Sequence, residues 1–227
     1  MLKAEQITKR YFRDTGNANY FDAVKPVSAE FAPGTLTVIT GRSGSGKTTF
    51  LHMMAGLLKP DGGRVTLDGT DLYALEDAAL SKFRGTRIGV IPQGRSLIGT
   101  LTVKENVLLP ASFSGKADVS DEALKWMRML GIDSLSDAMP AGLSGGELRR
   151  AAIARTLTQG TPVILADEPT GDLDDENTRL VLSVLQDAAK KEGRTVMLVT
   201  HETEAMQFCD RAYRMREGSL TDYESGV

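Results

Sequence analysis

Short apolar runs, each bounded by glycine, proline or charged residues, recur along this chain of 227 residues. Runs of this kind, without alternating polar positions, are typical of strands buried on both faces of a sheet. They occupy residues 36–40, 88–91, 163–166 and 195–200. Residues 2–8 and about 20–31 are predicted as two further strands, joined by a polar turn that contains glycine and asparagine.

Helical periodicity fills the segments between these runs. The predicted helices cover residues 50–58, 76–83, 119–130, 144–157 and 174–191. The expected apolar face of the third helix consists of Ala123, Leu124, Met127 and Leu130. Trp126, the only tryptophan, is either a core residue or part of a patch that a partner covers. Residues 212–223 are predicted to form a closing hairpin that turns at Glu217-Gly218.

Strands that alternate with helices predict an α/β fold with a mostly parallel sheet, an antiparallel β edge and an inserted α-helical piece. Between about residues 94 and 143 the pattern changes, because helical segments alternate with polar loops and no β-branched run occurs. We therefore expect a single domain over residues 1–227, with a helical subdomain at about 94–154 inserted in its core.

Composition narrows the classes of function. The net charge of −3 does not suit a protein that binds nucleic-acid backbones, which normally carries a basic face. Cys209 is the only cysteine, so no internal disulfide can form, which fits a cytosolic setting. Residues 1–10 lack the apolar core of a signal peptide. Stretches free of polar side chains, such as residues 53–58, are far shorter than the ~20 residues needed to cross a bilayer.

The segment Gly41-Arg42-Ser43-Gly44-Ser45-Gly46-Lys47-Thr48-Thr49 carries the clearest chemistry. It matches the pattern G-x-x-x-x-G-K-[ST] between a predicted strand and a predicted helix, the context that gives the pattern its meaning. Its glycines let backbone N–H groups form a nest for phosphate oxygens in front of a helix N-terminus. Lys47 would neutralise the β- and γ-phosphates, and the Thr48 hydroxyl would join a Mg²⁺ shell. The alternative is a glycine-rich turn with a chance lysine.

An apolar strand ends in two carboxylates, Asp167 and Glu168. If that strand lies beside the phosphate-loop strand, Asp167 reaches the Mg²⁺ shell and Glu168 lies next to the γ-phosphate. Glu168 could there orient or deprotonate water. The alternative is an acidic helix start, which is common in α/β proteins, but the pairing with the phosphate loop favours the first interpretation.

The run Leu143-Ser144-Gly145-Gly146-Glu147 supports two interpretations. Ser144 and Glu147 form the pattern of a capping box, which is sufficient to start a helix. A cap needs no glycine pair, however, and each glycine costs about 1 kcal/mol of helix stability relative to alanine. The pair therefore indicates a close approach to this helix end, and a helix N-terminus free of side chains is an anion site.

With these motifs in this order, the sequence resembles the ATP-binding subunit of an ABC transporter along essentially the whole chain. The matching segments are residues 41–48 (Walker A), Gln93 (Q-loop), 143–147 (LSGG signature), 163–168 (Walker B), 171–174 (D-loop) and His201 (switch histidine). Residues 83–90, 101–107 and 169–174 are most similar to the group of lipoprotein-releasing, macrolide-exporting and cell-division ABC ATPases. Ile91-Pro92 before Gln93, and Glu147-Leu148-Arg149-Arg150 in place of a glutamine-rich run, depart from the usual pattern.

The resemblance implies a role for each matching residue. Residues 41–49 bind ATP, and Tyr11 stacks on adenine, unless it is only a strand-end aromatic. Thr48, Gln93 and Asp167 hold Mg²⁺. Glu168, His201 and Gln93 are the expected catalytic residues.

Other implied roles need a second molecule. Ser144, Gly145, Gly146 and Glu147 act in trans on the γ-phosphate bound by another copy, and Asp174 reaches across that interface. The expected partners are a second copy, in an ATP-bound head-to-tail dimer, and a separately encoded integral membrane permease, with no nucleic acid. The expected location is cytoplasmic, on the inner face of the cell membrane. Leu97, Ile98 and Leu101 are either part of the permease-docking groove or subdomain core.

The expected function is hydrolysis of MgATP to drive a membrane subunit in export, extraction or mechanotransmission. A regulatory ATPase that activates a cell-wall or signalling partner without transport is an alternative that the sequence does not separate. A soluble ABC protein acting on DNA or ribosomes is less favoured, because such proteins usually carry a coiled-coil insertion or a second nucleotide domain. A GTPase or nucleotide kinase is disfavoured, because the chain has no Asn-Lys-x-Asp motif.

Overall fold

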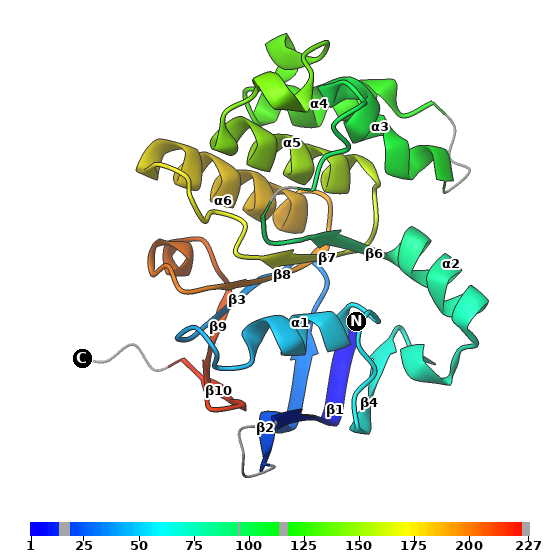
Figure 1. Cartoon of the computed structure of the whole chain (residues 1–227), viewed down its shortest axis with the longest axis vertical. Helices are drawn as coiled ribbons and strands as arrows, with labels where there is room; N and C mark the ends of the chain where they lie inside the picture. Colours follow the sequence, from blue (N-terminus) through cyan, green and yellow to red (C-terminus); the bar gives the residue numbers. More distant parts are fainter. Residues whose placement is uncertain (14–18, 95, 114–117, 224–227) are drawn as a thin grey trace.

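The computed structural model describes residues 1–13, 19–94, 96–113 and 118–223. The strands in these ranges form a six-stranded sheet, in the order β10-β9-β3-β8-β7-β6, and a four-stranded sheet, in the order β2-β1-β4-β5. Figure 1 shows the six-stranded sheet in the middle of the molecule, with the four-stranded sheet below it and most helices above.

Neighbouring strands of the six-stranded sheet run parallel, except at one edge. The parallel strands are β3 (Leu36–Thr40), β6 (Ile88–Ile91), β7 (Val163–Asp167), β8 (Thr195–Thr200) and β9 (Arg211–Arg216). At the edge, β10 (Ser219–Asp222) pairs antiparallel with β9 and completes the predicted hairpin. The four apolar runs therefore predicted β3, β6, β7 and β8 correctly, because strands buried on both faces need no polar alternation. Strand β9 was predicted as part of the closing hairpin, and its positions alternate between buried and exposed.

The four-stranded sheet is antiparallel and contains β1 (Leu2–Arg13), β2 (Asn19–Phe31), β4 (Gly62–Leu67) and β5 (Thr70–Asp71). The first strand is longer than the predicted segment 2–8. The turn predicted between β1 and β2 falls on residues 14–18 and lies outside the described residues.

Helix α1 (Lys47–Met54) lies between the two sheets, where Phe50, Leu51 and Met53 are fully buried. The helix starts earlier and ends earlier than the predicted segment 50–58. It starts directly after Gly46 and ends before Gly56, and both glycines have the positive φ angles that interrupt a helix. Helix α2 (Asp77–Arg87) follows η1 (Leu72–Ala74) and leads into β6.

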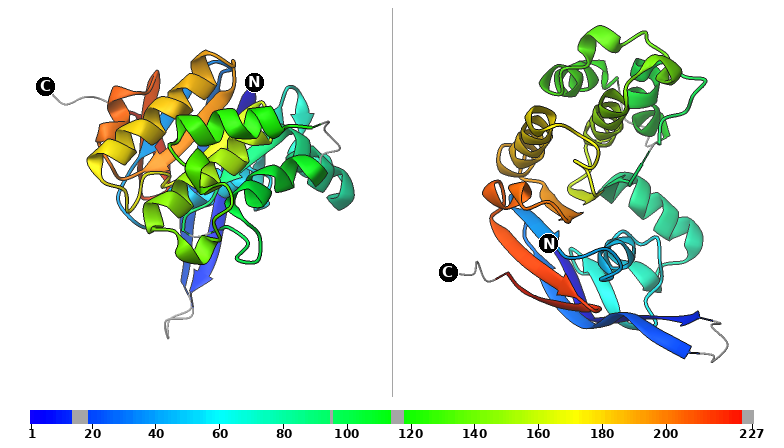
Figure 2. Two further views of the ribbon diagram at one scale, coloured as in Figure 1. Left: turned by 90° about the horizontal axis from the view of Figure 1, so that it is seen from above. Right: turned by 60° about the vertical axis from the view of Figure 1, so that its left-hand side comes forward.

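Four helices lie on the other side of the six-stranded sheet (Figure 2). They are α3 (Val103–Phe113), α4 (Ser120–Met129), α5 (Gly145–Thr158) and α6 (Asp175–Lys190), with the short turns η2 (Asp133–Leu135), η3 (Pro140–Gly142) and η4 (Glu204–Gln207) between elements. The apolar side chains of α5 and α6 share one core with the upper face of the sheet, and α3 and α4 pack against α5. No helix in the described ranges is long and apolar enough to cross a membrane.

The buried face of α4 corrects one sequence expectation. Ala123, Trp126 and Met127 are buried in the core, whereas Leu124 is 36% exposed. Trp126 faces the core because burial of its ring removes far more apolar surface from water than burial of a leucine side chain. The buried face of the helix therefore includes Trp126 and excludes Leu124. Trp126 is thus a core residue and not part of an open patch.

Tyr73 in η1 secures the C-terminal end of α1. Its hydroxyl oxygen lies 2.7 Å from the carbonyl oxygen of Met53 and 2.6 Å from that of Leu58, so its one proton serves two carbonyls. Burial of the phenol raises the pKa of Tyr73, which keeps it in the donating form.

Replacing this hydroxyl should destabilise the fold. We expect Tyr73→Phe to lower the free energy of unfolding by about 1–2 kcal/mol, because two partly buried carbonyls lose their donor. Urea denaturation measures the change. The control is Tyr20→Phe, at a tyrosine that is 68% exposed, and its effect should stay within about 0.5 kcal/mol. Equal effects of the two variants would contradict a role for Tyr73 in holding α1.

Candidate active site

A cleft of about 1030 Å³ opens at the carboxyl ends of the parallel strands. Its walls come from β1, the phosphate loop, the ends of β6, β7 and β8, and the first turns of α5. The predicted site residues that line it are Tyr11, Arg42, Ser43, Gly44, Gly46, Lys47, Thr48, Thr49, Gln93, Gly145, Glu168 and His201. Asp167 lies just behind the wall, bonded to Thr48.

Some predicted residues lie elsewhere. Gly41 and Ser45 line an adjoining cavity of about 680 Å³ on the other side of the phosphate loop. The Oγ atom of Ser45 is buried and has no hydrogen-bond partner among the described residues. Ser144, Gly146, Glu147 and Asp174 do not line the cleft.

The glycines of the phosphate loop are required by close backbone approach. A Cβ atom on Gly46, whose φ is +106°, would lie 2.2 Å from the carbonyl oxygen of Ala23 in β2. A Cβ atom on Gly41 would lie 2.3 Å from the carbonyl oxygen of Met215 in β9. The loop therefore sits between two strands at a distance that only glycine permits.

Lys47 starts α1 and is buried at the base of the cleft, only 6% exposed. Its Nζ atom donates hydrogen bonds to the carbonyl oxygens of Gly41 at 2.7 Å and Arg42 at 3.3 Å. A carboxylate oxygen of Glu168 lies 3.9 Å away. The ammonium group is thus held in place by its own loop, at the N-terminal end of a helix, where phosphate oxygens are stabilised.

Asp167 ends β7 and is 2% exposed. The Thr48 hydroxyl donates to its carboxylate at 3.2 Å. Burial raises the pKa of Asp167, only partly opposed by the bond from Thr48. A buried carboxylate beside a hydroxyl is a pair of hard oxygen donors, so these residues fit a magnesium ion.

The strand order differs from the expectation for this pair. The sequence argument took as its condition that β7 lies beside β3, but β8 lies between them. Thr48 reaches Asp167 nonetheless, because α1 packs against the face of the sheet and contacts both β7 and β8. The intervening strand delivers His201 to the same edge.

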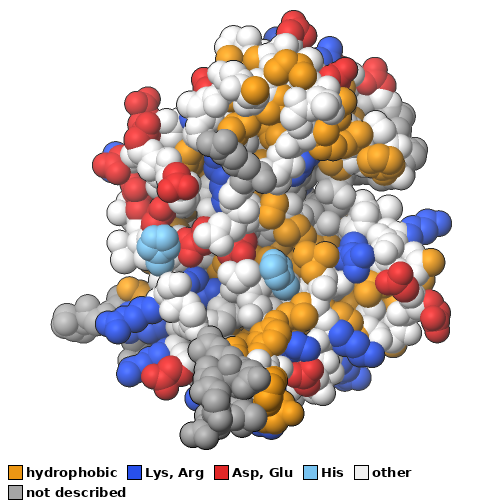
Figure 3. Space-filling model, in the orientation of Figure 1, with side chains coloured by type: hydrophobic (Ala, Val, Ile, Leu, Met, Phe, Trp, Pro, Cys, Tyr) orange, Lys and Arg blue, Asp and Glu red, His pale blue; other side chains and the backbone are white. Residues whose placement is uncertain are grey.

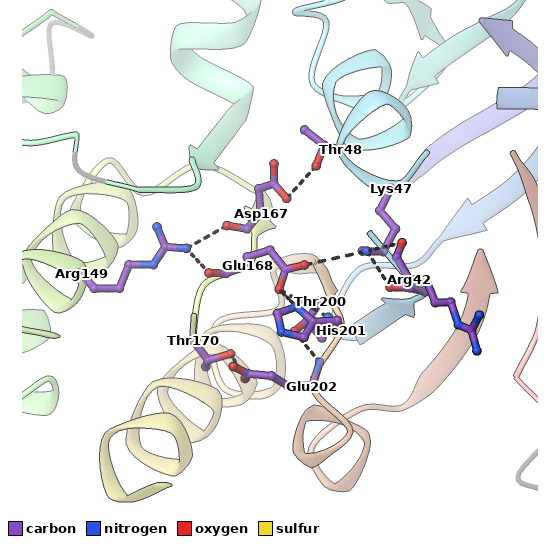
Figure 4. A network of polar contacts seen from close by, with 11 residues as sticks. Arg42, Lys47, Thr48, Arg149, Asp167, Glu168, Thr170, Thr200, His201 and Glu202 are labelled. Atoms are coloured by element: carbon purple, nitrogen blue, oxygen red, sulfur yellow. Dashed lines mark hydrogen bonds and ion pairs between the residues drawn. The ribbon is translucent and has the colours of Figure 1, made fainter. Parts of the chain in front are cut away.

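Glu168 and His201 lie side by side in the wall of the cleft and contact each other (Figure 4). The Nδ1 atom of His201 lies 3.0 Å from a carboxylate oxygen of Glu168. The Glu168 backbone has a left-handed φ of +47°, which costs roughly 1–2 kcal/mol for a residue other than glycine. Strain of this kind is concentrated at functional sites, because the surroundings must hold it in place. Gln93 is exposed on another wall of the same cleft.

Tyr11 lies at the mouth of the cleft and pairs with Phe21, which the sequence analysis did not identify. The two residues are opposite each other in the β1–β2 ladder, and their ring centroids are 5.8 Å apart. Tyr11 is 37% exposed, so its ring is free to receive a flat ligand. Antiparallel pairing of the two predicted strands could have revealed Phe21, but only once the register was known.

Ser144 and Glu147 form the predicted capping box at the start of α5. This is the first of the two interpretations of residues 143–147, a helix cap or an anion site. The N–H of Glu147 donates to the Ser144 hydroxyl at 3.3 Å, and the N–H of Ser144 donates to the Glu147 carboxylate at 2.7 Å. These bonds hold the pKa of Glu147 below its usual value. Asp174 is the N-cap of α6, and its side chain accepts from the N–H of Asn177 at 2.8 Å.

Two residues of the segment after Gln93 differ in their exposure. Leu97 is partly buried and packs against the upper core, whereas Ile98 is 42% exposed. The side-chain oxygen of buried Asn106 accepts from the N–H of Ile98 at 2.7 Å. Leu97 is therefore core, and Ile98 is left on the surface.

A glycine loop before a helix, a buried lysine, a hydroxyl beside a buried carboxylate, and a glutamate paired with a histidine meet at one sheet edge. Such a site defines the class of phosphate-loop nucleotide-binding proteins.

Comparison with known proteins gives the family. A family model described as "ABC transporter" matches residues 24–171. The chain is 35% identical to the lipoprotein-releasing system ATP-binding protein LolD 2 of Rhodopirellula baltica, covering 100% of this chain and 91% of that protein. It is also 35% identical to the ABC transporter ATP-binding protein YxdL of Bacillus subtilis, covering 97% and 85%. With the macrolide export ATP-binding/permease protein MacB of Chlorobaculum tepidum it shares 35% identity over 98% of this chain but only 34% of that protein.

Solved structures agree with these matches. The ATP-binding cassette MJ0796, as a dimer in a post-hydrolysis state bound to ADP and Pi, superposes with a TM-score of 0.89 at 32% identity, covering all of both chains. The structure of cbiO1 from Clostridium perfringens gives 0.80 at 26% identity, covering 97% of this chain and 86% of that one. This protein belongs to the ABC transporter family, as an ATP-binding subunit and an ATPase. The predicted family and fold class are confirmed.

The buried charge of Asp167 leads to a prediction. Because burial raises its pKa, the ionised form opposes folding when no cation is bound. We expect Asp167→Asn to raise the urea midpoint of the nucleotide-free protein and to lower its ATP turnover, a trade-off common at active sites. Urea denaturation and a phosphate-release assay measure the two effects. A lowered midpoint would contradict the destabilising charge, and unchanged turnover would contradict a role in hydrolysis.

Proposed function

We propose that the chain binds MgATP in this cleft and hydrolyses it as a head-to-tail homodimer, which drives a separately encoded membrane permease. The observation that carries this proposal is the convergence of Lys47, Thr48, Glu168 and His201 on one cleft. We further propose that residues of about 94–154 form a helical subdomain inserted in the catalytic core. No nucleic acid is a partner in this proposal.

The proposed roles follow from the positions of the side chains. Backbone N–H groups of residues 42–49 and the Lys47 ammonium group bind the β- and γ-phosphates. The rings of Tyr11 and Phe21 support the adenine ring of ATP. Glu168 accepts a proton as water forms a bond to the γ-phosphorus and the bond from that phosphorus to the bridging oxygen of ADP breaks. His201 orients Glu168 and the water.

The residues also fit a magnesium ion. Thr48 and Asp167 would hold it, with Gln93 as a third oxygen donor from the opposite wall. The ion would neutralise charge on the β- and γ-phosphates. Binding of a cation next to Asp167 would also remove the unfavourable burial of its charge.

Three observations support a head-to-tail dimer. Ser144 and Gly145 are exposed at the N-terminus of α5, and a side chain on Gly145 would meet nothing within 4 Å. Packing within the described chain therefore does not require glycine at position 145. The glycine favours a ligand that approaches this helix end from outside. On the face in Figure 3, acidic side chains gather over the N-terminal end of α6 and basic ones lie below them, so a two-fold rotation can bring opposite charges together.

Two observations support coupling to a membrane permease, namely the names of the relatives and the exposure of Ile98 after Gln93. Ile98 lies a few residues beyond the cleft and presents apolar surface. A change at Gln93 on nucleotide binding would move this segment. In this proposal the protein lies at the inner face of the cell membrane through its permease.

The first test concerns Glu168. Glu168→Gln should keep ATP binding but lower turnover by about 10²–10⁴-fold, the usual range for general acid–base help. Size-exclusion chromatography with light scattering should show a monomer without nucleotide and a dimer with MgATP, because trapped ATP holds the interface. Turnover within a few-fold of wild type would remove Glu168 from this role, and a persistent monomer would contradict nucleotide-driven closure of the isolated chain.

The second test separates the cap of α5 from its role in trans. Gly145→Asp should stabilise the monomer by about 0.3–1 kcal/mol, because an anion in the first helical turn suits the helix dipole. The same charge should repel a triphosphate presented by a second copy. Combined with Glu168→Gln, which traps ATP, the variant should therefore bind MgATP without dimerising, and alone it should lose turnover. Gly99→Asp is the control, since that glycine is exposed and its side chain would also meet nothing within 4 Å. Dimerisation by Gly145→Asp would contradict the trans role.

A further inference from the structure

Arg149 is buried one turn into α5, only 7% exposed, and its guanidinium group points at the ends of two strands (Figure 4). It forms no ion pair with a carboxylate among the described residues. Its donors instead meet main-chain carbonyl oxygens: Nε that of Pro169 at 3.0 Å, Nη1 those of Pro92 at 2.5 Å and Gly94 at 3.4 Å, and Nη2 those of Asp167 at 2.8 Å and Glu168.

These acceptors belong to the two loops that carry Gln93 and Glu168. The carbonyls of Asp167, Glu168 and Pro169 follow one another where the chain leaves β7 with the left-handed φ of Glu168. Pro92 and Gly94 flank Gln93 on either side. A single planar group thus fixes the backbone next to Glu168, the proposed general base, and next to Gln93, the proposed metal ligand.

Only a guanidinium group satisfies this set of acceptors. Its N–H donors lie in one plane in a rigid fork, so it can bond to several carbonyls at fixed directions. A lysine ammonium group is a single point, and a glutamine amide has two donors. Burial of a charge without a carboxylate partner is costly, and this burial lowers the pKa of Arg149. A cost of this kind persists where the fixed geometry serves a function.

We propose that Arg149 is a positioning residue that holds Glu168 in its reactive geometry and links the two ends of the active site. This inference rests on the proposed role of Glu168. Arg149 follows Gly145 by one helical turn. A displacement of the first turn of α5 by nucleotide on a second copy would therefore be transmitted directly to the base in this copy.

The test compares Arg149→Gln and Arg149→Lys in the full chain. We expect Arg149→Gln to lower the single-turnover rate of MgATP hydrolysis by about 10²-fold, the effect of misplacing a reacting group by about 1 Å, with ATP affinity changed by only a few-fold. Arg149→Lys should recover part of the rate, because it keeps the charge. Rates are expressed per bound nucleotide, so that any unfolded fraction does not count as a loss of rate.

The decisive measurement is the double variant with Glu168→Gln. If Arg149 acts through Glu168, Arg149→Gln should lower the already reduced rate of Glu168→Gln by no more than a few-fold. Losses that multiply would overturn the inference, as would an Arg149→Gln rate within a few-fold of wild type. If Arg149→Gln does not fold, Arg149→Lys alone and with Glu168→Gln gives the same comparison.

Arg194 provides the matched control. It is also 7% exposed, its guanidinium donates to the Leu157 carbonyl at 2.9 Å, and it is paired with Glu192 away from the cleft. Arg194→Gln should lower the midpoint of thermal unfolding without changing the rate per bound nucleotide. An equal loss of rate in Arg194→Gln would show that any buried arginine has this effect and would overturn the inference.

Failure of the proposed function has a different signature. Wild-type turnover by Glu168→Gln alone would remove the proposed base, and with it the inference on Arg149. A reduced rate in Glu168→Gln together with a wild-type rate in Arg149→Gln would overturn only the inference on Arg149.

Discussion

The parallel direction of β3, β8, β7 and β6 is the constraint on which the site depends. Parallel strands have their carboxyl ends at one edge of the sheet, so residues that follow different strands meet there. The phosphate loop follows β3, His201 follows β8, Glu168 follows β7 and Gln93 lies just after β6. Because these strands are buried on both faces between α1 and the upper helices, their relative heights are fixed by the two cores. The geometry of the site is therefore a property of the core.

This constraint also explains what could be predicted from sequence. The phosphate loop and the paired carboxylates are local patterns, and the structure brings Thr48 and Asp167 into contact as expected. The order of the strands is not local, and the condition that β7 adjoins β3 is not met, because β8 lies between them. Phe21 and Arg149 escaped notice for the same reason, since each acts on residues distant in sequence. The only feature of the sequence that pointed to Arg149 was that Glu147-Leu148-Arg149-Arg150 replaces the glutamine-rich run usual in the family.

Helix α4 shows a different limit. Periodicity predicted the helix correctly, but it placed Leu124 in the core. In the structure Trp126 is buried instead and Leu124 is exposed. Helical periodicity does not fix which residue at the border of the apolar face is buried. The size of the side chains then decides which of them turns inward. The centroid of the Trp126 ring also lies 4.4 Å from the Lys125 ammonium group and 5.5 Å from the guanidinium carbon of Arg194, so charged side chains lie over the ring.

The capping box of α5 engages the amides of Ser144 and Glu147, and no partner for the amides of Gly145 and Gly146 lies within the described part of the chain. Its two interpretations are therefore compatible. A helix N-terminus has N–H groups without intrahelical partners, and the Ser144 hydroxyl satisfies the one at Glu147. The amides of Gly145 and Gly146 precede it and carry no side chains in front of them. Capping therefore fixes the direction of the helix while its first amides remain free to bind an anion, and one turn later Arg149 ties the same helix to Glu168. A rigid helix with an open N-terminus is what a contact between two nucleotide sites requires.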